Sequence, residues 1–164
     1  MMTFEVEHTG SNKIQGLLSG LKNAFNDTER KNILRAVGTI YTQATRERFD
    51  KQYDVDRKKW KPLRPVTVRL KGHSKIGHKT GALRKSIRMR IQGDSVYVGT
   101  DLIYAKTFHY FVKKGQYGKT SRDQPIPWGN IPRRSFIGRN LRLDDKVIKM
   151  LKRTYKEKYG FASL

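Results

Sequence analysis

The chain has 164 residues and a formal net charge of +22 at pH 7. This length is typical of one domain, and we expect residues 1–164 to form a single one. The absence of cysteine excludes disulfides, cysteine-based zinc sites and thiol catalysis. The apolar runs are too short for a membrane helix, and the first residues lack the pattern of a secretory signal, so we expect no membrane contact.

The positive charge is concentrated in the middle of the chain. Residues 57–143 hold 22 Lys or Arg and three Asp, and residues 57–93 hold 13 Lys or Arg and no carboxylate. Because uncompensated like charge raises the free energy of a compact state, this block indicates a negatively charged partner. The candidates are nucleic acid, an acidic protein surface and anionic lipid, and the alternative is a solvated face.

The N-terminal part predicts one strand and two helices. Apolar and acidic residues alternate over residues 4–8, which is typical of a half-buried strand. Residues 14–25 carry an apolar stripe at helical spacing. Asn26 and Glu29 have the spacing of a capping box, and the apolar stripe behind them predicts a second helix that ends near Phe49.

The middle of the chain predicts an extended segment and a hairpin. Residues 53–78 are polar, basic and interrupted by Pro and Gly, and we expect a short strand or helix at residues 66–70. Residues 87–98 alternate on both sides of Gly93-Asp94, which predicts a β-hairpin with one apolar face and one face of arginines.

The C-terminal part predicts further helical structure. We expect a helical turn within residues 101–111 and a Gly- and Pro-rich loop over residues 113–129. Asp144 and Asp145 indicate the start of a final helix, where acidic residues favour the positive end of the dipole. The predicted class is therefore α+β, with an N-terminal strand and helices, a central antiparallel sheet with a hairpin, and a C-terminal helix.

The histidines do not form a recognisable site. Residues 72–80 resemble a phosphate-binding loop, but His78 separates the second glycine from Lys79 and shifts the register. His73 and His78 are five residues apart, whereas three or four would align two imidazoles on one helix face. We expect solvated loop histidines and no metal, and a basic nuclease that uses one of them is a minor alternative.

The carboxylates and aromatic residues also favour structural roles. The close carboxylate pairs are Asp54 with Asp56, in a polar loop, and Asp144 with Asp145, at a helix start. We therefore expect no catalytic residue and no cofactor. Several aromatic side chains near basic residues are of the type that stacks on nucleobases, but core and interface packing is the favoured interpretation. They are Tyr53, Trp60, Tyr104, Tyr110, Tyr117 and Trp128.

An ordered series of short motifs resembles a known family. The motifs are Trp60-Lys61-Pro62-Leu63 followed by Thr67, Thr80-Gly81-Ala82-Leu83-Arg84-Lys85-Ser86, Val98-Gly99-Thr100, Tyr104-Ala105, and Ile131-Pro132-Arg133-Arg134-Ser135-Phe136-Ile137-Gly138. In this order they resemble the bacteriophage virion morphogenesis family, which includes Mu-type tail completion and neck proteins. The resemblance spans about residues 14–158.

The resemblance implies a structural, non-enzymatic virion component. It would be made in the host cytoplasm and act at the tail end or the head–tail junction, as a tail completion, neck or tail terminator protein. The resemblance further implies a homo-oligomeric ring around the DNA path, expected to be a hexamer, in contact with other phage neck or tail proteins. The competing interpretation is a basic, sequence-nonspecific nucleic-acid-binding protein, which the charge alone supports.

Two sets of residues are the candidates for function. The contact set would meet an acidic neighbour or, as second candidate, packaged DNA; it comprises Arg57, Lys58, Lys59, Lys61, Arg64, Lys71, Lys75 and Lys79, with Arg88 and Arg90 as a second row on the hairpin. The family-motif set is expected to be structural; it comprises Trp60, Pro62, Leu63, Thr80, Gly81, Leu83, Ser86, Gly99, Tyr104, Ala105, Pro132, Arg133, Phe136 and Gly138.

Some of these residues have a more specific expectation. Gly81 is expected at a backbone turn and Leu83 in the core. Pro132 and Phe136 are expected to form a rigid turn with a hydrophobic plug into a neighbour or the sheet. The ring interfaces are expected at the strand edges, at residues 4–8 and in the loop over residues 106–129.

Overall fold

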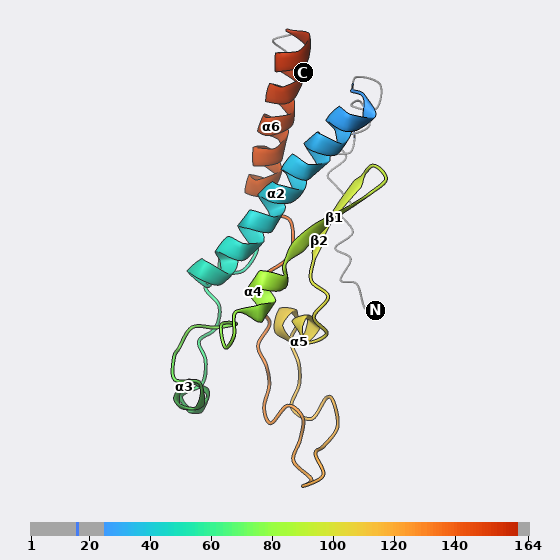
Figure 1. The fold of residues 1–164 in the computed structure, drawn as a ribbon. Coiled ribbons are helices and arrows are strands. Elements are labelled where there is room, and N and C mark those ends of the chain that lie inside the picture. Colours follow the sequence, from blue (N-terminus) through green and yellow to red (C-terminus); the bar gives the residue numbers. More distant parts are fainter. Residues whose placement is uncertain (1–15, 17–24, 161–164) are drawn as a thin grey trace. The chain divides into compact units, whose positions relative to one another are not determined.

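The computed structural model describes Gly16 and residues 25–160 of the chain (Figure 1). Residues 25–160 form α2 (Asp27–Lys51), α3 (Pro65–Lys71), α4 (Ala82–Ser86), β1 (Arg88–Gln92), β2 (Ser95–Gly99), α5 (Ala105–His109) and α6 (Leu141–Tyr159). The predicted α+β class is confirmed at this level. The predicted strand over residues 4–8 and nearly all of the predicted first helix lie outside the described residues.

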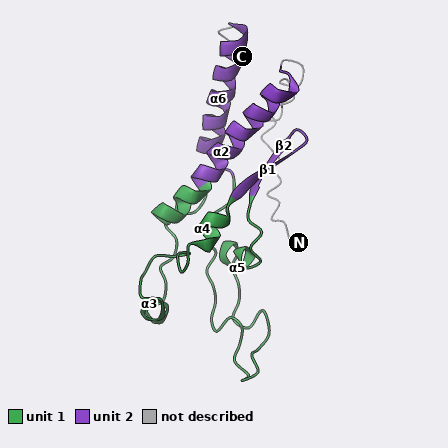
Figure 2. Ribbon diagram, viewed as in Figure 1, with its two compact units in different colours: residues 1–4, 45–87, 99–138 green, residues 5–44, 88–98, 139–164 purple. Residues whose placement is uncertain are grey.

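The described chain divides into two compact units (Figure 2). Unit 1 contains residues 45–87 and 99–138, and unit 2 contains residues 25–44, 88–98 and 139–160. Helix α2 contributes its first part to unit 2 and its last two turns to unit 1. Within the described residues, no helix combines the length and the hydrophobicity that crossing a membrane requires.

Helix α2 begins with the predicted capping box. The Asn26 backbone N–H donates to Glu29 Oε2, and the Glu29 N–H donates to Asn26 Oδ1, both at 2.9 Å. This reciprocal pair satisfies two backbone donors that have no partner within the helix. The helix ends at Lys51, two residues beyond the predicted end at Phe49.

The predicted hairpin of unit 2 is confirmed, but the predicted central sheet is smaller than expected. Among the described residues, the sheet consists of β1 and β2 alone. Arg88 and Arg90 are exposed on β1 while Met89 and Ile91 are half-buried, so the apolar and arginine faces are as predicted. Because a two-stranded hairpin is at best marginally stable alone, its apolar face requires a packing partner.

The hairpin packs directly on α2 at Gly38. A Cβ at this position would lie 2.5 Å from Met89 Sδ and 2.7 Å from a methyl group of Val96. Real side chains do not approach this closely, so the hairpin sits where only glycine leaves room. The glycine, which lowers intrinsic helix stability by about 1 kcal/mol, is therefore needed for packing.

Helix α6 begins three residues before the predicted start. The Asn140 side chain caps the helix by accepting from the Leu143 N–H at 2.9 Å. Asp144 is consequently buried, where it accepts a hydrogen bond from the Tyr41 hydroxyl at 2.8 Å and pairs with Arg139. The hydrogen bonds that the Arg139 guanidinium donates to the Asp144 carboxylate raise the pKa of Arg139. Asp144 thus connects α6 to α2 within unit 2.

The short helices of unit 1 differ in how well the sequence predicted them. Helix α3 settles the choice between strand and helix at residues 66–70; it has Pro65 in its first turn and no buried residue. Helix α5 corresponds to the predicted helical turn within residues 101–111. Helix α4 was not predicted, because five residues are too few to show a helical period.

Replacing Gly38 with leucine is expected to destabilise unit 2. The larger side chain would collide with Met89 and Val96, and overpacking of this kind costs about 1–3 kcal/mol. The free energy of unfolding, measured by chemical denaturation, should fall by that amount. The control is Thr39→Ala on the exposed side of the same turn, which should change stability by less than about 0.5 kcal/mol. Equal effects of the two substitutions would contradict this packing.

Candidate functional site

Four aromatic rings form the core of unit 1. Phe49 lies 5.2 Å from Trp60, 5.6 Å from Phe108 and 5.1 Å from Phe136, measured between ring centroids. Trp60 also meets Phe108 edge-on at 5.4 Å. Such pairs contribute about 0.5–1.5 kcal/mol each beyond the area that they bury. Residues distant in the sequence are therefore held together by one aromatic cluster.

Arg48 fixes the cluster to the backbone of the last family motif. Its guanidinium is buried and donates to the carbonyl oxygens of Phe136 at 2.8 Å and Gly138 at 3.1 Å. Burial lowers the pKa of Arg48, and the negative charges of Asp54 and nearby groups partly oppose this. Phe136 itself is fully buried in this cluster, so the expectation that it plugs into a neighbour or the sheet is wrong.

The Thr80–Ser86 motif builds a turn and a short helix of unit 1. Gly81 has φ of +71°, a conformation that glycine adopts without strain, and Leu83 is buried, as expected for a turn residue and a core residue. The Ser86 hydroxyl donates to the Leu83 carbonyl and lies 2.6 Å from the Thr100 hydroxyl. The motif side chains thus make internal contacts, and their geometry offers no activated nucleophile.

An ion pair attaches the same motif to α2. The Arg84 guanidinium donates to both carboxylate oxygens of Asp50, at 2.9 Å and 2.8 Å. The bidentate hydrogen bond lowers the pKa of Asp50 and raises that of Arg84. Both side chains are partly exposed, so we assign this pair a modest contribution to stability.

The segment between Trp60 and Ile76, which carries four residues of the contact set, is anchored at both ends in the interior of unit 1. Trp60 at one end and Ile76 at the other are buried, and a Cβ at Gly77 would lie 3.0 Å from ring atoms of Phe49 and Phe108. The Gln52 side chain also binds both backbone groups of Ile76, at 3.1 Å and 2.7 Å. The intervening residues lie at the surface, which leaves the positive side chains of this segment accessible.

Residues 52–60 form a tight turn that presents the first lysines. Asp54 Oδ1 accepts from the backbone N–H groups of Asp56 and Lys58, each at 2.9 Å, so Asp54 stabilises the turn. Lys58, Lys59 and Lys61 are exposed. The lysines are therefore displayed on a hydrogen-bonded backbone, and the first carboxylate pair has a structural member.

Residues 71–79 have a locally positive environment. Burial and the nearby charges of Arg134 and Lys79 lower the pKa of Lys71, and burial with Lys75 and other positive neighbours lowers the pKa of His78. Gly72 ends α3, with its N–H bonded to the Val68 carbonyl, instead of opening a phosphate-binding loop. Within the described residues, no three His, Cys, Asp or Glu side chains are placed to hold a metal ion.

The remaining members of the contact set lie in both units. Arg57, Arg64, Lys75 and Lys79 are exposed in unit 1. Arg88 and Arg90 belong to the hairpin of unit 2, so the structure groups eight of the ten contact residues in one unit. This surface of unit 1, comprising Arg57, Lys58, Lys59, Lys61, Arg64, Lys71, Lys75 and Lys79, is called the basic block below.

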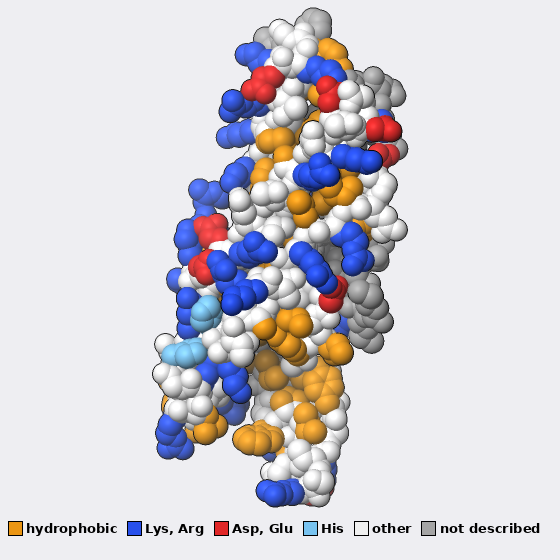
Figure 3. Space-filling model, in the orientation of Figure 1, with side chains coloured by type: hydrophobic (Ala, Val, Ile, Leu, Met, Phe, Trp, Pro, Cys, Tyr) orange, Lys and Arg blue, Asp and Glu red, His pale blue; other side chains and the backbone are white. Residues whose placement is uncertain are grey.

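Most of the aromatic residues near the block are exposed, which the sequence did not predict. Trp60 is buried, but Tyr104, Tyr110 and Tyr117 are about half exposed and Trp128 is 73% exposed. Figure 3 shows hydrophobic side chains gathered over the long loop between α5 and α6. Core packing is therefore the wrong interpretation for these four residues, and their packing at an interface stays a prediction.

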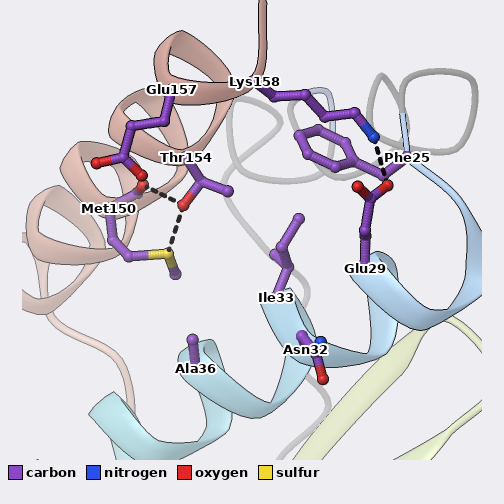
Figure 4. Close-up of a pocket in the computed structure, with 9 residues that line it drawn as sticks. All are labelled: Phe25, Glu29, Asn32, Ile33, Ala36, Met150, Thr154, Glu157 and Lys158. Carbon is purple, nitrogen blue, oxygen red and sulfur yellow. Dashed lines mark hydrogen bonds and ion pairs between the residues drawn. The ribbon is translucent and has the colours of Figure 1, made fainter.

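Unit 2 contains a cavity of about 460 Å³ between α2 and α6 (Figure 4). Phe25, Ile33 and Met150 line its apolar part. Its polar groups have internal partners, because Lys158 pairs with Glu29 and the Thr154 hydroxyl donates to the Met150 carbonyl. The cavity therefore presents no catalytic constellation.

The comparison with known families agrees with the ordered motifs. A family model of the phage virion morphogenesis family matches residues 10–155. The chain belongs to the phage virion morphogenesis family. No curated protein and no solved structure matches the chain. Membership assigns the chain to phage virion assembly.

In this phage protein, the family motifs are mainly structural within unit 1. Trp60, Leu83, Ala105 and Phe136 are buried. A Cβ added at Gly138 would lie 2.9 Å from a methyl group of Val55, so a larger residue would clash there. Leu63, Ser86, Gly99 and Pro132 are half-buried, whereas Pro62, Thr80, Tyr104 and Arg133 are exposed. Sequence reasoning missed Arg48 and Arg134, which are charged but buried.

The burial of His109 predicts a pH dependence of stability. Burial, with the nearby positive charges of Arg133 and Arg48, lowers the pKa of His109 from 6.5 to about 4. Between these values the unfolded chain binds a proton that the folded chain does not, so stability falls as pH falls from 6.5 towards 4. We expect wild type to lose roughly 2–3 kcal/mol more than His109→Gln between pH 7.5 and 4.5 in denaturant titrations. Equal losses in both proteins would contradict the burial of an uncharged imidazole.

Proposed function

We propose that this protein is a non-enzymatic structural subunit of the phage virion, located at the tail end or the head–tail junction. Family membership over residues 10–155 carries the proposal. It is supported by the motif residues of unit 1, whose polar groups bond to the backbone and to one another. This arrangement suits a rigid building block that contributes to tail completion, the neck or the tail terminus.

We further propose that copies of the chain form a ring around the DNA path. A head-to-tail interface whose rotation closes generates such a ring. The net charge of +22 repels free copies, so an anionic neighbour in the particle would favour closure. The isolated chain is therefore expected to be monomeric at low salt.

Quantitative mass spectrometry of purified virions tests the ring. The expected result is several copies per particle, with six as the favoured number. The comparison standard is a virion protein of known copy number from the same sample. One copy per particle would refute the ring, and absence from the particle would refute the structural assignment.

The basic block is the proposed contact surface of this subunit. Its eight side chains lie on one unit, and residues 57–93 contain no carboxylate that would neutralise them. An acidic neighbouring protein is the favoured partner, with packaged DNA second. With a protein partner, the charges would mainly accelerate encounter and fix register. With DNA, they would contact phosphates, with strong salt dependence and no sequence preference.

Reversing three charges of the block should prevent assembly. Lys58, Lys59 and Lys61 are exposed, so their joint replacement by Glu is expected to leave the fold intact and to lower infectious particle yield at least tenfold. The matched control replaces Lys31, Lys146 and Lys149 by Glu, which makes the same charge change on exposed positions of unit 2. Normal yield from the block variant would show that the block is only a solvated face.

Virions that lack the chain, together with a DNA titration of the wild-type chain, test the alternative function. A basic, sequence-nonspecific nucleic-acid-binding protein would be indicated by two results. Virions lacking the chain would be normal, and the affinity of the wild-type chain for duplex DNA would rise steeply as the salt concentration falls. Titration of a random-sequence duplex at 50 mM and 200 mM salt measures this. The proposed virion role instead predicts unjoined heads and tails, seen by electron microscopy, when the chain is missing.

A further inference from the structure

The loop between α5 and α6 exposes a group of large hydrophobic side chains. Trp128 is 73% exposed, Tyr117 is 52% exposed and Ile126 is 38% exposed, while Tyr110 and Phe111 are each about half exposed. A group of exposed large apolar side chains on one loop indicates an interaction site more strongly than a scattered single residue does. Tyr110–Trp128 is called the aromatic loop below.

Backbone hydrogen bonds give the aromatic loop a defined shape. The Tyr117 N–H donates to the Ile126 carbonyl at 2.9 Å, and the Ile126 N–H donates to the Gly118 carbonyl at 2.8 Å. At its base, Val112 and Ile131 exchange two backbone hydrogen bonds, at 3.1 Å and 2.8 Å. The exposed side chains therefore stand on a paired backbone, which lowers the entropy that binding must remove.

Side-chain contacts attach the aromatic loop to the rest of unit 1. The Tyr117 hydroxyl lies 3.3 Å from the Thr107 hydroxyl of α5. Arg64 of the basic block lies against Gly129, where an added Cβ would be 2.9 Å from Nη1. Arg64 therefore places part of the basic block next to the base of the aromatic loop.

The charge around the aromatic loop indicates the chemistry of its partner. Lys113, Lys114, Lys119 and Arg122 are exposed in it, and the only carboxylate between residues 102 and 143 is Asp123, which pairs with Lys119. Like charge opposes a second copy of this chain, because both units carry an excess of Lys and Arg. The aliphatic Ile126 and the hydrogen-bonded turns favour a protein surface over stacked nucleobases.

We propose that the aromatic loop is a preformed docking surface for a second, acidic virion protein, with Trp128 and Tyr117 inserted in apolar pockets of that partner. Tryptophan and tyrosine are the residues that most often dominate binding at the centre of protein interfaces. The surrounding lysines would meet acidic residues at the rim. This goes beyond the role proposed above, since it assigns a second surface and does not require a ring.

Photocrosslinking in assembling particles tests the proposal. Trp128→p-benzoylphenylalanine is introduced into the full chain in host cells that produce the phage, and Leu141→p-benzoylphenylalanine is the control at an exposed apolar position of unit 2. We expect an adduct from position 128 with another virion protein, mapped by mass spectrometry to an acidic peptide, and at least tenfold less of it from position 141. An adduct with a second copy, with nucleic acid or with a non-acidic peptide would overturn the proposal, as would no excess over the control.

A substitution without crosslinking gives an independent measurement. Trp128→Ala should lower infectious particle yield at least tenfold while the unfolding midpoint stays at the wild-type value, because this side chain contributes little to the fold. Leu141→Ala should leave yield unchanged. Equal losses from the two variants would overturn the proposal. A copy number of one would remove the ring and leave both of these results intact, so the two proposals fail separately.

Discussion

The guanidinium of Arg48 bonds the last part of α2 to the carbonyls of Phe136 and Gly138. It lies beside the aromatic cluster of Phe49, Trp60, Phe108 and Phe136, which the chain assembles from four separate segments. Trp60 of this cluster lies within the segment that carries the basic block, and Phe108 precedes the aromatic loop by two residues. The surface of unit 1 therefore depends on a small buried core in which a charged group has a structural role.

The buried arginine and the exposed lysines have opposite physical requirements. Arg48 is stable in the interior because its guanidinium donates hydrogen bonds to carbonyl oxygens and because the nearby negative charge of Asp54 favours its charged form. Most lysines of the basic block are exposed to water. Lys59 and Lys71 each donate to one backbone carbonyl, and Lys71 is half-buried. The free energy of such a surface falls when it meets an anionic neighbour.

Much of the regular structure could be predicted from the sequence because its signals are local. The Asn26–Glu29 capping box and the alternation around Gly93 each depend on a few adjacent residues, and both predictions are confirmed. The predicted start of α6 was three residues late, because it relied on the acidic residues Asp144 and Asp145 and not on the Asn140 cap. Asp144 is instead buried. Its burial depends on Tyr41 and Arg139, which only the tertiary structure brings to it.

The candidate site was harder to predict, for two physical reasons. A charge normally indicates exposure, so Arg48 and Arg134 were not expected in the core. A signal for Arg48 was present, because it lies at helical spacing from Val37, Tyr41 and Thr45, which belong to the buried face of α2. The exposure of Trp128 had no such signal, since an irregular loop has no period from which a buried face can be inferred.

The most direct test of this account is the free energy of unfolding of Arg48→Met, measured by chemical denaturation beside Lys51→Met. Methionine keeps the apolar volume but leaves the Phe136 and Gly138 carbonyls without their donors, so we expect a loss of about 2–5 kcal/mol. Lys51 forms an exposed pair with Glu47, and its replacement should cost less than about 1 kcal/mol. An Arg48→Met protein as stable as the Lys51→Met control would contradict the central role of this buried guanidinium.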